Sequence, residues 1–183
     1  MTRVPTIALF FFTWLAVFGQ TQFPVLTNLL ATPVTVLPAL MVYAALTHGI
    51  VTVAVLAFGA GVGADSLSAN PLGISILPLF AVGFVLQLRQ HLILRDQIYA
   101  QLWLGLAAGI TIPGLTLGML YLDSQQPITG PFLLGQVFLT GILNALLCPA
   151  LFAFFDALRR TFDYQPMTEG SFRPDREIKR GRI

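Results

Sequence analysis

Charged residues are almost absent from two long parts of this chain. Asp65 is the only one in positions 4–88, and Asp123 is the only one in positions 97–155. Over the 183 residues, 56% are hydrophobic and 10% are charged, and the mean hydropathy is +0.79. A soluble domain needs charge along every segment of its surface. The sequence therefore excludes an ordinary soluble domain and predicts a membrane protein with several spans.

Residues that form disulfides or bind metals are scarce. Cys148 is the single cysteine, which excludes an intramolecular disulfide and a cysteine-rich metal site. We interpret it as a small, buried apolar residue. His48 and His91 are the only histidines, and neither has a second ligand at metal-binding spacing. We therefore predict that the protein holds no metal and no cofactor.

Pairs of ionisable groups, which catalysis usually requires, are missing from the apolar stretches. Ser66, Ser68 and Ser75 have no acid–base partner within reach in the sequence. Membrane-embedded proteases, phosphatases and acyltransferases all need more than this. We therefore predict that the protein is not an enzyme.

Apolar stretches of helical length make up most of the chain. A helical span needs about 20 apolar residues, so there is room for about six or seven. The stretches are apolar on all sides rather than at alternate positions, which favours helices over strands. We predict an all-α bundle of six transmembrane helices within residues 1–160, with apolar stretches at 6–19, 34–46, 50–64, 74–88, 98–122 and 132–158.

Two of these stretches allow a second interpretation. Only Thr47-His48-Gly49 separates the second from the third, so they form either a tight hairpin or one long broken helix. We favour the hairpin because His-Gly is a natural turn. The first stretch, preceded by Arg3, could also be a signal peptide. No small-x-small cleavage pattern follows Phe18, so we expect this stretch to be retained.

The basic residues near the stretches all fall on one predicted side. They are Arg3 before the first stretch, Arg89 and Arg95 between the fourth and fifth, and Arg159 and Arg160 after the sixth. The opposite loops carry only Asp65 and Asp123. By the positive-inside rule, both termini are predicted to be cytoplasmic.

Residues 161–183 form a polar tail, which we predict to be cytoplasmic and disordered because it has too little apolar surface to fold alone. From Arg159 onward, seven basic residues against four acidic ones leave a net charge of +3. This charge either contacts anionic headgroups or a cytoplasmic partner, or is an ordinary positive stop after the last span.

Proline and glycine recur within the predicted spans. Pro38, Pro78, Pro113 and Pro149 each remove a backbone donor, so we expect four kinked helices that pack together. Small residues let helices approach closely in lipid. On this basis we predict a helix-packing role for Gly59, Gly63, Gly105, Gly109, Gly114 and Gly118. The run 59–64 lacks the lysine and the preceding strand of a nucleotide-binding loop, so close packing is the better interpretation.

Asp65 and Asn144 are the two polar residues of most interest. Asp65 ends an apolar, glycine-rich stretch, where a carboxylate is costly to bury. It either locks the following turn by accepting hydrogen bonds from backbone amides of the turn or of the next helix start, or contacts a partner or ligand. We expect the fourth span to start at Asn70-Pro71. Asn144 lies within the last span, with Gln136 on nearly the same face, and we favour a hydrogen bond to a neighbouring helix over a ligand site.

Several of these residues form a pattern that resembles the rod shape-determining membrane protein family MreD. The pattern is Gly61-x-x-x-Asp65, then Pro71-Leu72-Gly73, then Gly83 and Arg89, with Asn144-Ala-Leu-Leu-Cys-Pro149 in the last span. The resemblance covers residues 34 to about 160. It marks Gly61, Asp65, Pro71, Leu72, Gly73, Asn144 and Pro149 as structural or partner-contact residues.

The resemblance implies a non-enzymatic scaffold of the machinery that builds peptidoglycan during cell elongation and maintains rod cell shape. Such proteins lie in the bacterial inner membrane. The implied partners are an MreC-type protein, a RodA-type glycosyltransferase, an elongation-specific penicillin-binding transpeptidase and, indirectly, the actin-like MreB. The family also resembles the substrate-binding subunits of energy-coupling-factor transporters in its six-helix fold.

A vitamin-type binding subunit of a transporter is therefore the alternative. A small-molecule site needs polar and aromatic groups converging on a cavity. The outer loops offer mainly Asp65, Asn70, Asp123, Ser124, Gln125 and Gln126. This set is small for tight binding, so the sequence favours the scaffold.

Overall fold

The computed structural model of the protein describes residues 3–22, 35–68, 71–92, 97–122 and 131–162. These residues form six α-helices and one 3₁₀ turn, which confirms the predicted all-helical fold. The elements are α1 (Arg3–Gln22), α3 (Leu37–Thr47), α4 (Ile50–Ser66), α5 (Ile76–Arg89), η1 (Gln90–Leu92), α6 (Ile98–Leu122) and α7 (Pro131–Phe162). Each α-helix overlaps one of the six predicted apolar stretches.

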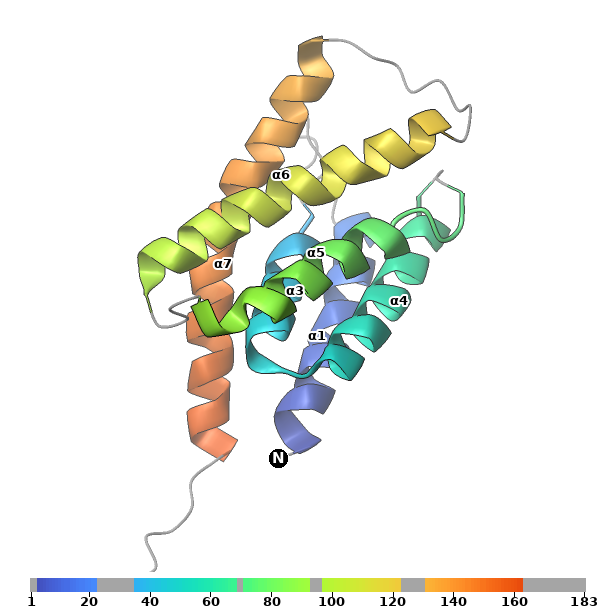
Figure 1. The fold of residues 1–183 in the computed structure, drawn as a ribbon. Coiled ribbons are helices and arrows are strands. Elements are labelled where there is room, and N and C mark those ends of the chain that lie inside the picture. Colours follow the sequence, from blue (N-terminus) through green and yellow to red (C-terminus); the bar gives the residue numbers. More distant parts are fainter. Residues whose placement is uncertain (1–2, 23–34, 69–70, 93–96, 123–130, 163–183) are drawn as a thin grey trace, which may run out of the picture.

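The α3–α4 connection is the predicted hairpin. His48 and Gly49 are both extended, with ψ angles of 168° and 166°, and α4 starts at the next residue. Figure 1 shows α3 and α4 running in opposite directions on either side of this connection. Two extended residues break the i to i−4 hydrogen-bond pattern, so one continuous helix is excluded.

The 11-residue helix α3 is the centre of the molecule. Its residues 37–46 are all buried, and α3 contacts each of the other five helices. A helix that is apolar on every side needs burial on every side. At 1.5 Å per residue α3 is only about 17 Å long, which is well short of the hydrocarbon layer of a membrane.

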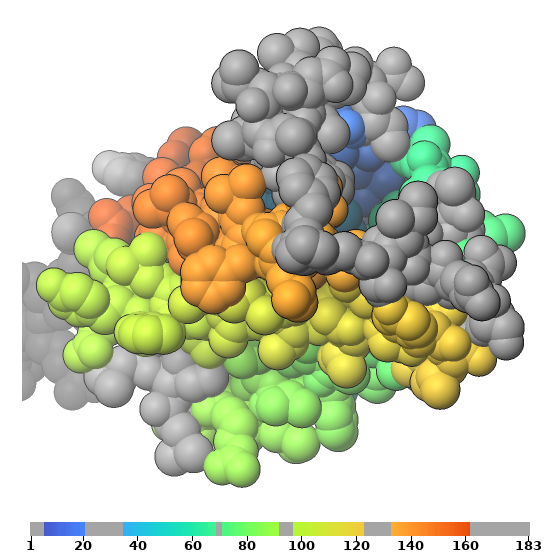
Figure 2. Space-filling view, turned by 90° about the horizontal axis from the view of Figure 1, so that it is seen from above, coloured from blue at the N-terminus to red at the C-terminus, as the bar shows by residue number. Residues whose placement is uncertain are grey.

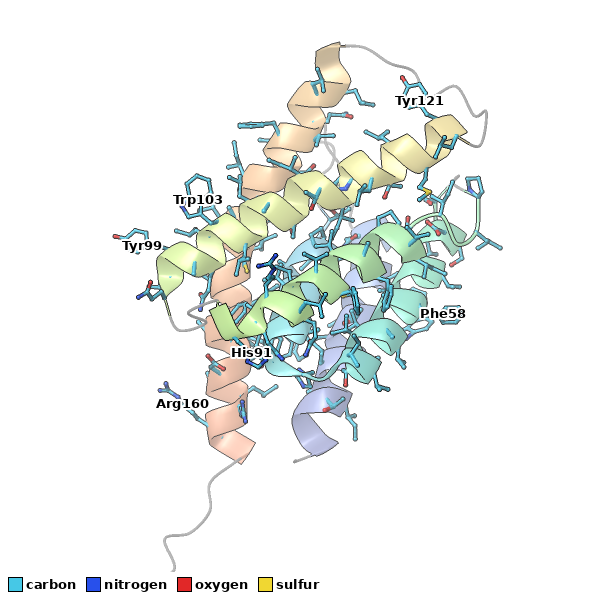
Figure 3. All side chains as sticks on the ribbon, in the orientation of Figure 1. Phe58, His91, Tyr99, Trp103, Tyr121 and Arg160 are labelled. Carbon is cyan, nitrogen blue, oxygen red and sulfur yellow. The ribbon has the colours of Figure 1, made fainter. Side chains whose placement is uncertain are left out.

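The helices alternate in direction, so the chain has two distinct ends. Figure 1 shows the start of α1 and the end of α7 at the same end of the molecule. This end, which we call the basic end, also receives Arg89 and His91; Figure 3 shows His91 and Arg160 toward it. The opposite end, called the turn end, carries the α4–α5 turn with Asp65. Of the other residues in the predicted charge pattern, Arg95 and Asp123 lie outside the described residues.

Large apolar side chains project outward from all five helices around α3. One example from each is Phe11 (65% exposed), Phe58 (63%), Leu88 (62%), Trp103 (71%) and Leu146 (63%). Figure 3 shows Phe58 and Trp103 on the outside of the bundle. By length and composition, α6 and α7 could each cross a membrane, and the other helices are apolar over shorter described lengths.

The prolines occupy two kinds of position, which corrects one prediction. Pro113 and Pro149 lie inside α6 and α7, as predicted. Pro38 and Pro78 were expected inside spans too, but they lie in the first turns of α3 and α5. Proline is tolerated there because the first backbone N–H groups of a helix have no acceptor within it.

Glycines bring α6 and α7 into close contact where they cross. A Cβ at Gly105 would lie 2.6 Å from the backbone oxygen of Asn144, and one at Gly109 would lie 2.9 Å from the Cα of Gly141. From the other side, a Cβ at Gly141 would lie 2.5 Å from the Cγ1 of Ile110. Figure 2, seen from the turn end, shows α7 against α6. The predicted packing role of Gly105 and Gly109 therefore matches the crossing.

No close contact in the described part of the chain supports the packing role predicted for Gly114, Gly118 and Gly59. Within the described residues, nothing lies within 4 Å of the Cβ position at any of the three. Helices that cross at an angle touch over a short stretch only, and Gly114 and Gly118 lie beyond that stretch. In α4, by contrast, Gly63 packs on Val17, whose Cγ1 lies 3.2 Å from the Cβ position.

Candidate functional site

Asp65 is the one buried acidic or basic residue in the described part of the chain, at 1% exposure. It ends α4 at the turn end of the molecule. An ionised carboxylate without partners is costly to bury. The hydrogen bonds that Asp65 accepts therefore decide what this residue does.

Three donors satisfy the two oxygens of Asp65. Oδ2 accepts from the backbone N–H of Gly73 at 2.9 Å and from that of Ser75 at 3.0 Å. Oδ1 accepts from the hydroxyl of Ser75 at 2.5 Å. The donors stand immediately before α5, so Asp65 joins the end of α4 to the start of α5. These are the hydrogen bonds to the turn and to the next helix start that the turn-locking interpretation of Asp65 predicts.

Two glycines make this connection sterically possible. Gly73 has φ of +96°, which L-residues with a side chain rarely adopt. At Gly61, a Cβ would lie 2.9 Å from the Cα of Ile76, the first residue of α5. The sequence pattern Gly61, Asp65, Gly73 is thus one folded unit: a close approach, a carboxylate anchor and a left-handed turn residue.

The start of α5 is later than the sequence predicted. Asn70-Pro71 was expected to open the helix, whereas α5 starts at Ile76. Residues 72–75 form turns instead, with the N–H of Ile74 donating to Pro71 and that of Ile76 donating to Gly73. The positive φ of Gly73 prevents the helix from starting earlier. Leu72 is 72% exposed and is not part of the hydrogen-bonded unit.

Asn144 lies on α7, apart from the Asp65 unit, and differs from its predicted role. Its side-chain amide donates to the carbonyl of Thr140 in its own helix at 2.9 Å. Its Oδ1 is buried with no hydrogen-bond partner in the described part of the chain. Asn144 therefore contributes to the α6 contact by close packing against Gly105 and Gly109, and the expected inter-helix hydrogen bond is absent there. Pro149 lies five residues further along α7.

A cavity of about 470 Å³ opens beside Asp65 at the turn end. It lies where α6 and α7 diverge beyond their crossing, and the other four helices complete its walls. Apolar residues dominate the lining, among them Leu37, Leu79, Ile112 and Val137. The volume is within the usual range of small-molecule sites, about 300–1,000 Å³.

The polar groups of the cavity are few, and most are already used. The hydroxyls of Thr116 and Thr140 donate to carbonyls of their own helices, and the Asp65 oxygens accept the three bonds described above. Gln20 differs, because its Nε2 is buried and has no hydrogen-bond partner among the described residues. This amide is the group most available to a ligand.

Sequence reasoning missed the cavity because it searched the outer loops. Of the residues it named there, Asp65 does line the cavity, whereas Asn70 and residues 123–126 lie outside the described residues. The lining instead comes mainly from helices. Thr116, Gln136 and Thr140 are polar residues in otherwise apolar stretches, and they were the available signal. The described residues contain no group of three His, Cys, Asp or Glu that could hold a metal ion.

Comparison of the chain with protein-family models, with curated proteins and with solved structures finds no match.

Proposed function

We propose that the protein is an integral membrane protein of six helices, with α3 sheltered among the other five. The apolar outer face of the bundle supports this, because soluble monomers rarely expose large contiguous apolar patches. The hydroxyls of Thr13, Thr111 and Thr116 bond to carbonyls of their own helices, which suits a surrounding without water. Two helices of spanning length and composition fit the same placement.

The distribution of charge gives the orientation within this proposal. Arg89 lies in the last turn of α5 and Arg159 and Arg160 lie in the last turn of α7, and both helices end at the basic end (Figure 1). Asp65 lies in the last turn of α4, which ends at the turn end. Basic residues remain on the cytoplasmic side of bacterial membranes. The basic end and both termini therefore face the cytoplasm, and the turn end faces outward.

Within the membrane, the protein acts as a non-enzymatic scaffold of the cell-elongation peptidoglycan machinery, as the resemblance to the MreD family implies. The observation that carries this proposal is the Asp65 unit. Gly61, Asp65 and Gly73 belong to the pattern that resembles the family, and they fold into one hydrogen-bonded connection. An anchor of this kind gives the turn end a fixed shape, which a partner-binding surface requires.

The test is a pull-down of the tagged, full-length chain from gently solubilised bacterial membranes, analysed by mass spectrometry. We expect an MreC-type protein together with a RodA-type glycosyltransferase and a penicillin-binding transpeptidase. A matched membrane protein with the same tag serves as the control. Recovery of none of these partners above the control level contradicts the proposal.

A second candidate function is the vitamin-type binding subunit of a transporter, and the 470 Å³ cavity favours it. The same pull-down separates the two functions. A transport subunit brings down a pair of ATPase subunits and retains a small molecule through purification. A scaffold brings down the enzymes of wall synthesis instead.

A further inference from the structure

The walls of the cavity at the turn end indicate which class of ligand would fit there. Its volume of about 470 Å³ is within the range of sites that bind small organic molecules. Mainly apolar walls offer water few hydrogen-bond partners, whereas an apolar ligand gains from contact with them.

The charges around the cavity exclude an anionic ligand. No Lys, Arg or His is among the described residues that line it, and Asp65 is the only ionisable one. A phosphate or carboxylate inside would meet no opposite charge and would lie near a negative one. A cation would meet only Asp65, whose oxygens already accept three hydrogen bonds.

One polar group in the cavity wall, the side-chain amide of Gln20, lacks an acceptor among the described residues. Within the described residues, the Nε2 of Gln20 is buried without a hydrogen bond, which is unfavourable unless an acceptor binds there. Val17, three residues earlier on the same face of α1, packs on Gly63, so this part of α1 lies close against α4. The amide of Gln20 therefore lies at the cavity wall, where its Nε2 can donate.

We propose that this cavity binds an uncharged, lipid-like molecule, with an apolar chain between α6 and α7 and an ester or hydroxyl oxygen accepting from Gln20. This inference rests on the membrane placement proposed above, because such a ligand reaches the cavity from the bilayer. It is independent of the partners of the scaffold. It also separates this site from one built for a charged vitamin.

The experiment uses the full chain in phosphatidylcholine vesicles and a monoacylglycerol whose acyl chain carries a photoactivatable diazirine. Cross-linked peptides are located by mass spectrometry over a range of probe concentrations. We expect saturable labelling on α6 and α7 at the cavity wall. Unlabelled monoacylglycerol competes, whereas a lysophosphatidate and an alkylammonium of equal chain length compete at least tenfold less well.

Two neighbouring residues of α7 provide a matched pair of variants. Val137 lines the cavity, and Phe138 is 59% exposed on the outside. Val137→Trp fills the cavity and is expected to abolish the saturable labelling, whereas Phe138→Trp leaves it unchanged. Gln20→Leu keeps the shape of the site but removes one neutral hydrogen bond, so the half-saturating probe concentration rises about fivefold.

The outcomes that overturn the proposal are specific. Labelling that is unsaturable and spread over outer positions means that the probe reports only the bilayer. If the charged amphiphiles compete equally well, the ligand class need not be uncharged and that part of the proposal is wrong. If the half-saturating probe concentration is unchanged in both Val137→Trp and Gln20→Leu, the probe does not bind in this cavity. Flotation of the vesicles separates the causes. A chain that does not float overturns the membrane placement and this inference with it, while a floating chain without saturable labelling overturns this inference alone.

Discussion

Ser75 donates two hydrogen bonds to Asp65, ten residues earlier, one from its backbone N–H and one from its hydroxyl. Together with the bond from Gly73 they connect two helices through a single buried carboxylate. The two backbone donors have no other acceptor among the described residues, so the carboxylate satisfies both of them. The first two predictions follow from this connection.

Asp65→Ala leaves the part-buried backbone N–H groups of Gly73 and Ser75 without an acceptor. At about 1–3 kcal/mol for each fully buried unsatisfied group, two such groups cost at most about 2–6 kcal/mol. We therefore expect a loss of stability toward the lower end of this range, and less inserted protein. Thermal unfolding in detergent and the membrane-bound amount measure this. Ser66→Ala is the control, because Ser66 is exposed and bonds only within α4. Normal levels of Asp65→Ala with lost partner recovery would favour the contact reading instead.

Gly73→Ala places a side chain at φ of +96°. The left-handed conformation costs an L-residue roughly 1–2 kcal/mol, so we expect a lower unfolding temperature. Gly59→Ala is the matched change, because Gly59 lies within α4 with open space at its Cβ position. That variant is expected to be neutral or more stable. Equal unfolding temperatures for both variants would be inconsistent with the turn geometry.

Gly109→Leu forces α6 and α7 apart at their crossing. The Cβ alone would lie 2.8 Å from the Cβ of Asn144, so the helices must shift. Overpacking of this kind typically costs about 1–3 kcal/mol of stability, and occasionally more. We therefore expect a lower unfolding temperature. Gly114→Leu on the same helix meets open space and is expected to be tolerated. Unfolding temperatures of the two variants are compared, and a fully stable Gly109→Leu protein rejects the crossing.

Asn144→Leu removes a buried oxygen that has no hydrogen-bond partner in the described part of the chain. Leucine has a similar shape, and replacing an unsatisfied polar group by an apolar one is neutral or stabilising. We therefore expect an unchanged or higher unfolding temperature. If Asn144 holds two helices together by a hydrogen bond, the same substitution lowers the unfolding temperature. Chemical denaturation gives an independent value for the change in stability.

The proposed orientation is tested by cysteine labelling in intact cells. Leu72→Cys places a thiol at the exposed turn end, and His91→Cys places one at the exposed basic end. A membrane-impermeant maleimide is expected to label the first and to reach the second only after the cells are opened. The unmodified chain is the background control, because Cys148 is 0% exposed. The reverse labelling pattern refutes the orientation.

The sequence predicted the helices well because their signal is local. Uncharged apolar runs end where charge, glycine or a turn begins, and α6 coincides with its predicted range of 98–122. The hydrogen bonding of Asp65 to the turn was also predictable, since a carboxylate at a helix end before a glycine-containing turn has backbone donors nearby. The position of Cys148 in the core followed from its apolar neighbours.

Features that depend on how helices meet were not predictable in the same way. The spacing of Gly105 and Gly109 is the same as that of Gly114 and Gly118, yet only the first pair lies at the crossing. The crossing angle decides this, and no local pattern encodes that angle. The cavity is similar, because six helices supply its walls and each contributes only a few residues. Pro38 lies in the first turn because α3 starts at Leu37, and the sequence pattern does not define a helix start that exactly.

The central position of α3 has a consequence for biogenesis. The ribosome releases this helix early, yet two of the helices that cover it, α6 and α7, are synthesised last. Contacts between segments far apart in sequence form late and slowly. The core around α3 is therefore complete only after α7 (Pro131–Phe162) has inserted into the membrane. Until then, the apolar helix α3 lacks helices that cover it in the folded protein.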